Sequence, residues 1–362
     1  MLRNLVKTSV ARTLRWTGID RLLGAIWRGN DSPLVLGYHR VVEDFAAYAR
    51  HTIPPMLISR SLLERQLDWV GQRYHFVSLD DLGAWLLGQK SFSKPIAALT
   101  FDDGYRDVYD NAFPLLKRKG IPAAVFVMTD LVGTYALPIH DKLFLLLTGA
   151  FAPGSTEPHA LTNFMRGFGL QLPEEGAFVN DPSRTVNSIL ASLPQSEIHR
   201  IVAALEARTG IEEEVMEMHR TLSWEMVEEM HRAGVTIGSH SKSHVILTVE
   251  KMDKVMDETE GSKKDLERRL GTEIRHFAYP DGRFNKPALK AVADSGYRFA
   301  YTTSRHCDPD YPLLTIPRLL LWEKSSIDAY GNFSGTVLSC QIRGIFDLLH
   351  SRSPFPRVPR AA

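Results

Sequence analysis

The chain has 362 residues, with 43 Lys and Arg against 42 Asp and Glu, so its formal net charge is +1. A nearly balanced charge gives no overall field that would attract nucleic acid or an acidic polymer, and we expect no nucleic-acid partner. With 44% hydrophobic residues the chain can bury a large core, and one α/β barrel of about 250 residues with extensions accounts for its length.

Residues 1–30 are basic and amphipathic. Six Lys or Arg residues are interleaved with large apolar residues, and Asp20 is the only acidic one. The stretch lacks the uninterrupted apolar core of a secretory signal and the roughly 20 apolar residues of a transmembrane helix. It fits a helix in the interface of an anionic membrane about as well as a helix docked on the barrel. We therefore expect a cytoplasmic protein, with a peripheral contact at the inner face of the membrane under the first alternative.

The first two predicted strands end in residues that can carry chemistry. Residues 34–36 form a short apolar run before His39, and residues 95–101 form another before Asp102 and Asp103. Short apolar runs bounded by turn residues are typical of buried parallel strands. Adjacent carboxylates in a water-poor cleft raise one another's pKa unless a cation neutralises one, so the pair indicates a cation site. Taken alone, Asp-Asp-Gly is more simply a turn sequence.

A long interval, residues 141–220, follows this segment. It contains the apolar run 144–147, a Pro- and Gly-bearing stretch at 152–154 and the acidic run 212–214. Acidic runs are usually solvated helix faces. We interpret the interval as an inserted helical subdomain placed to cover the cleft.

His240 and His244 follow the next predicted strand, residues 235–237. Because parallel strands deliver their ligand-binding residues at their carboxyl ends, these histidines can meet Asp103 there. Three protein ligands leave one coordination position open for water, as in catalytic zinc sites, and Asp102 remains free as a base. Histidines four residues apart often lie in cores as satisfied polar groups, so the metal hypothesis depends on their conjunction with Asp-Asp-Gly.

Four segments in this order resemble motifs of the polysaccharide deacetylases of carbohydrate esterase family 4, the NodB-homology enzymes, and of their exopolysaccharide-linked branch. They are Tyr38 to Val41, Thr100 to Tyr105, His240 to His244 and Phe277 to Gly282. The resemblance implies a distorted (β/α) barrel with a helical insertion over residues 34–320, followed by a C-terminal extension, 321–362, with a disordered tail. It also implies a divalent metal, usually zinc, and removal of N-acetyl groups from an amino-sugar-containing glycan, either a polysaccharide or a lipid-linked oligosaccharide.

The resemblance assigns roles to single residues. The metal ligands are Asp103, His240 and His244, the base that takes a proton from the attacking water is Asp102, and the acid that protonates the departing amine is His39. Backbone N–H groups around residues 280–282 are candidates for stabilising the tetrahedral intermediate. Further candidates for oxyanion or substrate contacts are Tyr105, Tyr279, Asp281 and Arg318.

The chain departs from the commonest family pattern at three points. Ala278 stands where many members have an arginine that orients the base; Arg318 is a candidate substitute, and a surface or structural role explains it equally well. The Leu-x-His motif that usually supplies the acid is not evident, and His350 lies beyond the expected end of the barrel. Asp281 stands where aromatic residues are frequent. Two alternatives follow: a carbohydrate-binding barrel without turnover, or a hydrolase of another small-molecule carbon–nitrogen bond.

Overall fold

The structure is a computed structural model. It describes residues 32–151, 182–304 and 307–348, together with residues 8, 9, 13, 163, 164 and 166–168. The predicted amphipathic segment therefore lies outside the described residues except for three positions. The predicted disordered tail and His350 also lie outside them. Among the described residues, no helix combines the length and the apolar character needed to cross a bilayer.

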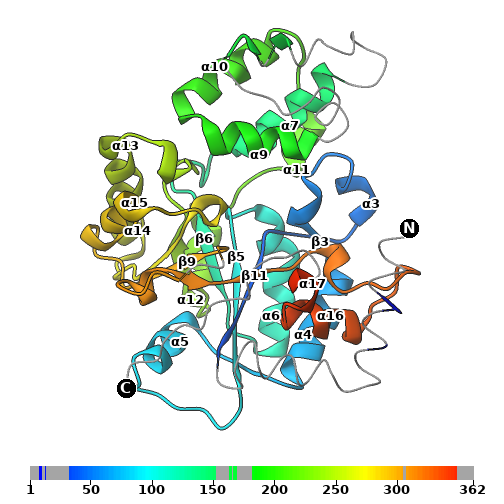
Figure 1. Ribbon diagram of the computed structural model, residues 1–362, viewed down its shortest axis with the longest axis vertical. Coiled ribbons are helices and arrows are strands. Elements are labelled where there is room, and N and C mark those ends of the chain that lie inside the picture. The colour runs from blue at the N-terminus through cyan, green and yellow to red at the C-terminus, as the bar shows by residue number, and fades with distance from the viewer. Residues whose placement is uncertain are drawn as a thin grey trace.

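The centre of the molecule is a parallel sheet of nine strands (Figure 1), in the order β10-β9-β8-β7-β6-β5-β1-β11, with β4 also paired to β5. The strands are β1 (Leu34–Tyr38), β4 (His75–Phe76), β5 (Ile96–Phe101), β6 (Ala124–Val127), β7 (Thr236–Ser239), β8 (His276–Ala278), β9 (Phe299–Thr302), β10 (Ile316–Pro317) and β11 (Leu319–Leu320). A separate parallel pair consists of β2 (Arg40–Val42) and β3 (Leu57–Ser59).

The two edges of the sheet are joined by one short segment, residues 316–320. β10 pairs with β9 at one edge, whereas β11 pairs with β1 at the other. Only Arg318 separates these two strands, so the segment nearly closes the sheet into a barrel. The predicted distorted (β/α) barrel of parallel strands is confirmed.

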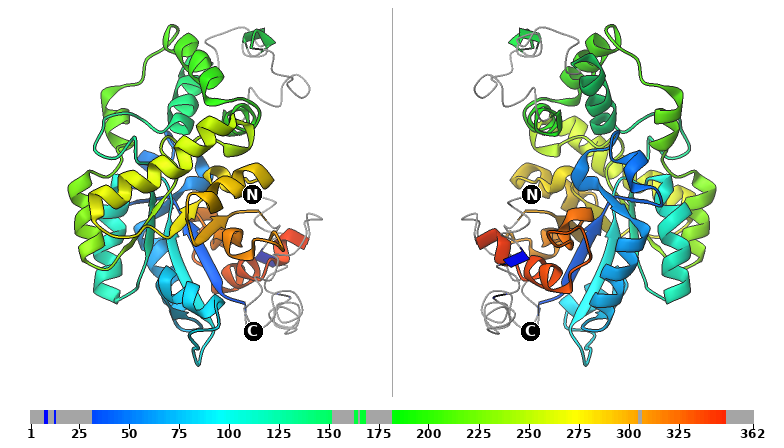
Figure 2. Two further views of the ribbon diagram at one scale, coloured as in Figure 1. Left: turned by 90° about the vertical axis from the view of Figure 1, so that its left-hand side faces the viewer. Right: turned by 90° about the vertical axis from the view of Figure 1, so that its right-hand side faces the viewer.

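Helices surround the barrel (Figures 1 and 2). They are α3 (Phe45–Tyr48), α4 (Arg60–Gly71), α5 (Leu79–Leu86), α6 (Phe113–Lys119), α12 (Trp224–Arg232), α13 (Met252–Met256), α14 (Ser262–Leu270), α15 (Lys286–Asp294), α16 (Gly335–Ile342) and α17 (Ile345–Leu348). Strand side chains alternate between two faces. On β1, Leu34 and Leu36 belong to the core beneath α4 and α6, whereas Val35 belongs to a second cluster with Phe126 and residues of α5.

The interval between β6 and β7 forms its own helical layer, which lies at the top of Figure 1. Its helices are α7 (Ile139–Ala150), α9 (Pro182–Ser192), α10 (Gln195–Glu206) and α11 (Glu213–Met218). Their apolar faces form a separate cluster that includes Leu143, Ile189 and Ile201. Ile53 and Ile246 of the barrel rim belong to the same cluster, so the layer packs on the carboxyl-end rim of the sheet.

Candidate active site

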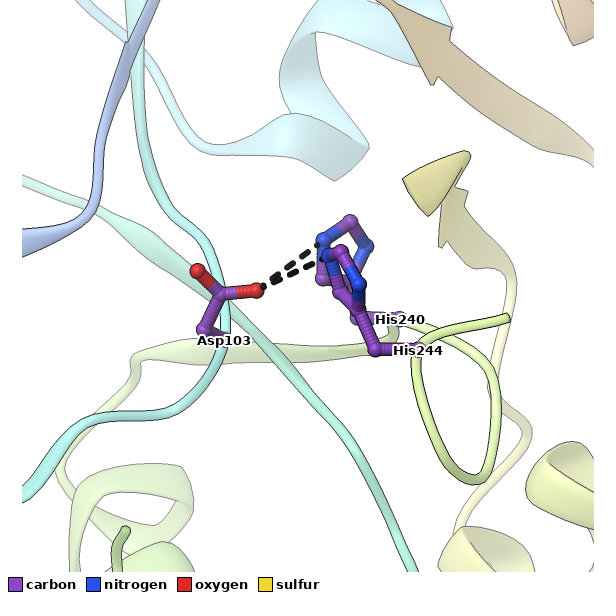
Figure 3. A group of neighbouring side chains, drawn as sticks. All are labelled: Asp103, His240 and His244. Atoms are coloured by element: carbon purple, nitrogen blue, oxygen red, sulfur yellow. Dashed lines mark ion pairs between the residues drawn. The ribbon is translucent and has the colours of Figure 1, made fainter. Parts of the chain in front are cut away.

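Asp103, His240 and His244 converge at the carboxyl end of the sheet (Figure 3). The Nε2 atoms of His240 and His244 each lie 3.4 Å from Asp103 Oδ1. All three side chains are buried, and their candidate ligand atoms lie within 4.8 Å of one another. The structure thus brings together residues separated by more than 130 positions in the chain, as expected for groups that follow β5 and β7, two strands of one parallel sheet with only β6 between them.

The chemistry of these atoms fits a divalent cation. His240 Nδ1 lies 2.8 Å from the carbonyl oxygen of Ala278, which can only accept, so Nδ1 carries the proton and Nε2 presents a lone pair towards Asp103. Neither carboxylate oxygen of Asp103 has a hydrogen-bond partner among the described residues. Burying an unpaired carboxylate is costly, and a metal ion bound between these groups would remove that cost.

The loop that carries the two histidines is held in an unusual conformation. The described non-glycine residues with positive φ are Asp103, Ser241, His244 and Asp281, with φ of 66°, 64°, 62° and 54°. Such conformations are sparsely populated for these residue types and cluster at functional sites. Buried Glu258 fixes the loop, since its Oε2 accepts the backbone N–H groups of Lys242 and Ser243 at 2.8 and 2.9 Å.

Asp102 is held by Arg318. The guanidinium donates to both carboxylate oxygens, at 2.6 and 2.7 Å, and to Thr100 Oγ1 at 3.0 Å. Burial raises the pKa of Asp102, but Arg318 and His240 outweigh it and hold that pKa below its usual range. Asp102 is therefore an ionised, oriented carboxylate beside the candidate metal ligands. Arg318, at the junction of β10 and β11, occupies the orienting position that Ala278 cannot fill.

The predicted catalytic residues line one cavity of about 270 Å³. Its polar lining includes His39, Asp102, Asp103, His240 and His244. Tyr279, with a buried hydroxyl that has no partner among the described residues, and half-exposed Asp281 also line it. Asn187 and Leu190 of α9 complete the lining, so the helical layer contributes directly to the cavity wall.

His39 follows β1 and faces both aspartates. Its Nδ1 is buried and has no partner within the part of the chain that the structure describes. Burial lowers the pKa of His39, and the carboxylates of Asp103 and Asp102 oppose that shift without reversing it. A lowered pKa makes the imidazolium, when it forms, a stronger acid towards a departing amine.

Neither Tyr105 nor Arg318, which are predicted oxyanion or substrate contacts, is among the residues that line the cavity. Tyr105 has no exposed surface, and its hydroxyl donates to Asp141 Oδ2 at 2.5 Å. The guanidinium of Arg318 is occupied by Asp102 and Thr100. The side chains of both residues contact other side chains of the site, and their predicted oxyanion or substrate contacts stay predictions.

Two residues near the site were not predicted, His140 and Asp141 at the start of α7. His140 lines the cavity, and its ring centroid lies 4.6 Å from that of His244. Asp141 is fully buried behind it. The available signal was a His-Asp pair shortly before the apolar run 144–147, at the predicted start of the helical insertion, where α7 begins at Ile139.

Comparison with known proteins finds relatives that are named as deacetylases. The chain is 20% identical over 247 residues to the putative polysaccharide deacetylase YxkH of Bacillus subtilis, covering 68% of this chain and 58% of that protein. It is 32% identical over 112 residues to the poly-beta-1,6-N-acetyl-D-glucosamine N-deacetylase of Staphylococcus aureus, covering 28% of this chain and 38% of that protein. The chain thus spans less than two thirds of the length of either relative.

Solved structures share the fold. The deacetylase PplD of Streptococcus pyogenes superposes with a TM-score of 0.54 at 17% identity, over 86% of this chain and 98% of that chain. IcaB from Ammonifex degensii gives 0.53 at 20% identity, over 86% and 97%. A model of the family described as polysaccharide deacetylase matches residues 89–163 and 177–300, which include Asp102, Asp103, His240 and His244. This match extends over more than half of the sequence, and the chain belongs to the polysaccharide deacetylase family.

Proposed function

We propose that the protein is a metal-dependent hydrolase that removes N-acetyl groups from an amino-sugar-containing glycan. The observation that carries the proposal is the placement, in one cavity, of three candidate metal ligands beside a carboxylate oriented by an arginine. The name of the Staphylococcus aureus relative, which describes an N-deacetylase of a poly-N-acetylglucosamine, supports the choice of substrate class.

Each of the predicted catalytic residues and metal ligands has its own role in the proposed reaction. Asp103, His240 and His244 would hold the metal, which we infer to be zinc. A divalent metal bound there would lower the pKa of water and polarise the acetamide carbonyl. Asp102 accepts the proton of the attacking water, whose oxygen forms a bond to the acetyl carbon. His39 donates a proton to the nitrogen as the carbon–nitrogen bond breaks, so the products are acetate and a free amine.

The substrate is either a polysaccharide or a lipid-linked oligosaccharide. A cavity of about 270 Å³ is too small for a glycan chain, so most of such a substrate would lie across the rim. Asp281, which is half-exposed at that rim and already paired with Arg283 at 2.5 Å, is placed to meet the neighbouring sugar. Contact of residues 1–30 with an anionic membrane would favour the lipid-linked alternative.

The proposal is tested by measuring metal content together with acetate release from N-acetylglucosamine oligomers. We expect the native chain to contain a divalent metal and to release acetate, and a chelator to abolish release until zinc is restored. His244→Ala should lose both metal and activity, because three ligands become two. Metal without acetate release from any oligomer would leave a binding protein or a hydrolase of another carbon–nitrogen bond, and a native chain that binds no metal would refute the proposal.

Replacing His39 tests the identity of the acid. We expect His39→Ala to slow acetate release at least tenfold with metal content unchanged, because proton transfer from a positioned group contributes about 10²- to 10⁴-fold. The comparison should include an activated substrate whose amine is a better leaving group, since such a substrate needs little protonation and should lose much less rate. Equal losses on both substrates would assign His39 another role.

A further inference from the structure

The helical layer places a histidine and a carboxylate beside the candidate metal ligands. His140 Nε2 lies 3.8 Å from Asp103 Oδ2, the carboxylate oxygen on the opposite side from the one that faces His240 and His244. Tyr105 Oη lies 2.8 Å from the same His140 nitrogen and 2.5 Å from Asp141 Oδ2. All three side chains are buried. A chain of contacts therefore runs from Asp141 through Tyr105 to His140 and on to Asp103.

The hydrogen atoms shared between Asp141, Tyr105 and His140 can be assigned by counting donors. Tyr105 has one proton, and an ionised carboxylate can only accept, so the tyrosine hydroxyl donates to Asp141. The same oxygen then accepts from His140 Nε2–H. His140 Nδ1 has no partner among the described residues. Asp141 thereby fixes the orientation of His140 through Tyr105.

Two of the buried aspartates around the site have no lysine or arginine partner among the described residues. Four aspartates are buried here: Asp102, Asp103, Asp107 and Asp141. Asp102 pairs with Arg318, and Asp107 pairs with Arg40 at 2.9 Å. Within the described ranges, neither Asp103 nor Asp141 has an ion pair to lysine or arginine, and Asp141 Oδ1 has no hydrogen-bond partner. Two unpaired buried carboxylates match the charge of one divalent cation.

We propose that the Asp141–Tyr105–His140 chain supports the metal centre, and that His140 is a positioning residue for the ligand Asp103. This inference rests on the proposed function, because it assumes that Asp103, His240 and His244 bind a metal. His140 contacts Asp103 Oδ2 at 3.8 Å without a hydrogen bond to it, so it positions that carboxylate by packing against it. Losing a group that orients a metal ligand typically costs about 10- to 100-fold in metal affinity. The helical layer thus has a second role, since it completes the metal centre as well as lining the cavity.

The test is a zinc titration of the metal-free full chain against a chromophoric chelator, with Tyr105→Phe, Asp141→Asn and the double variant. We expect each single variant to weaken zinc binding about 10- to 100-fold. The double variant should bind no more weakly than the worse single variant, because the two groups act in series. The visible absorption of bound Co²⁺ should change in the same variants, since the geometry at Asp103 changes.

Tyr38→Phe is the matched control. Tyr38 is also a buried tyrosine, and its hydroxyl donates to Gln66 Oε1 at 2.6 Å, in the core beneath α4. It should lose stability without losing zinc affinity. If Asp141→Asn fails to fold, Tyr105→Phe still tests the inference, because it removes a single oxygen atom. Native-like zinc affinity in Tyr105→Phe and in folded Asp141→Asn would overturn this inference alone, whereas a native chain that binds no zinc would overturn the proposed function with it.

Discussion

Asp102→Asn is expected to lower the rate of acetate release about 10²- to 10⁴-fold while metal stays bound. An amide has nearly the shape of a carboxylate, but it cannot take a proton from water. Asp102 lies beside the ligand set without belonging to it, because the candidate ligand atoms are those of Asp103, His240 and His244. The change therefore separates catalysis from metal binding, which no substitution of a ligand can do.

The measurement compares kcat, metal content and thermal stability in the native chain and in Asp102→Asn. Stability should fall as well, because the asparagine leaves Arg318 buried without a counter-ion. Asp253→Asn, an exposed change in α13, is the control for losing one carboxylate and should behave like the native chain. Loss of metal in Asp102→Asn would place Asp102 among the ligands, and native kcat would assign the base elsewhere.

The barrel and the ligand set could be predicted because both depend on short local patterns. Apolar runs followed by Asp-Asp-Gly or by His-x-x-x-His predict a strand and the residues at its end. Parallel pairing of the strands brings those ends together. The resemblance to known motifs added their order. Asp103, His240 and His244 thus meet as expected.

The support of the site could not be predicted in the same way. Arg318 reaches Asp102 because two strands of two residues each, β10 and β11, pair with opposite edges of the sheet. Strands this short show no periodicity. Likewise, Tyr105 belongs to a recognisable motif, but its partners His140 and Asp141 come from an insertion whose packing no local pattern specifies. Contacts between an insertion and a barrel depend on the tertiary fold.

The ion pair between Arg318 and Asp102 leads to the second large effect. We expect Arg318→Met to lower the free energy of unfolding by about 3–5 kcal/mol at neutral pH, because one buried charge is left unpaired. It should also slow acetate release strongly, since Asp102 loses both its orientation and the cation that keeps it ionised. The double variant Arg318→Met/Asp102→Asn carries neither charge and should recover part of the lost stability, although it remains inactive.

The effect of Arg318→Met on the free energy of unfolding should depend on pH, in a direction that follows from the pKa of Asp102. In the native chain the pKa of Asp102 is lowered, so the pair stabilises the fold above the unfolded pKa, and that contribution is lost as pH falls through the lowered value. In Arg318→Met the largest remaining influence is burial, which raises the pKa, so the cost of the unpaired carboxylate is greatest at neutral pH and declines as pH falls through the raised value. Urea unfolding at neutral and mildly acid pH should therefore show the deficit of Arg318→Met shrinking in acid, while the deficit of the double variant changes less. A deficit independent of pH would mean that Arg318 acts through packing alone and that its charge does not hold Asp102 ionised.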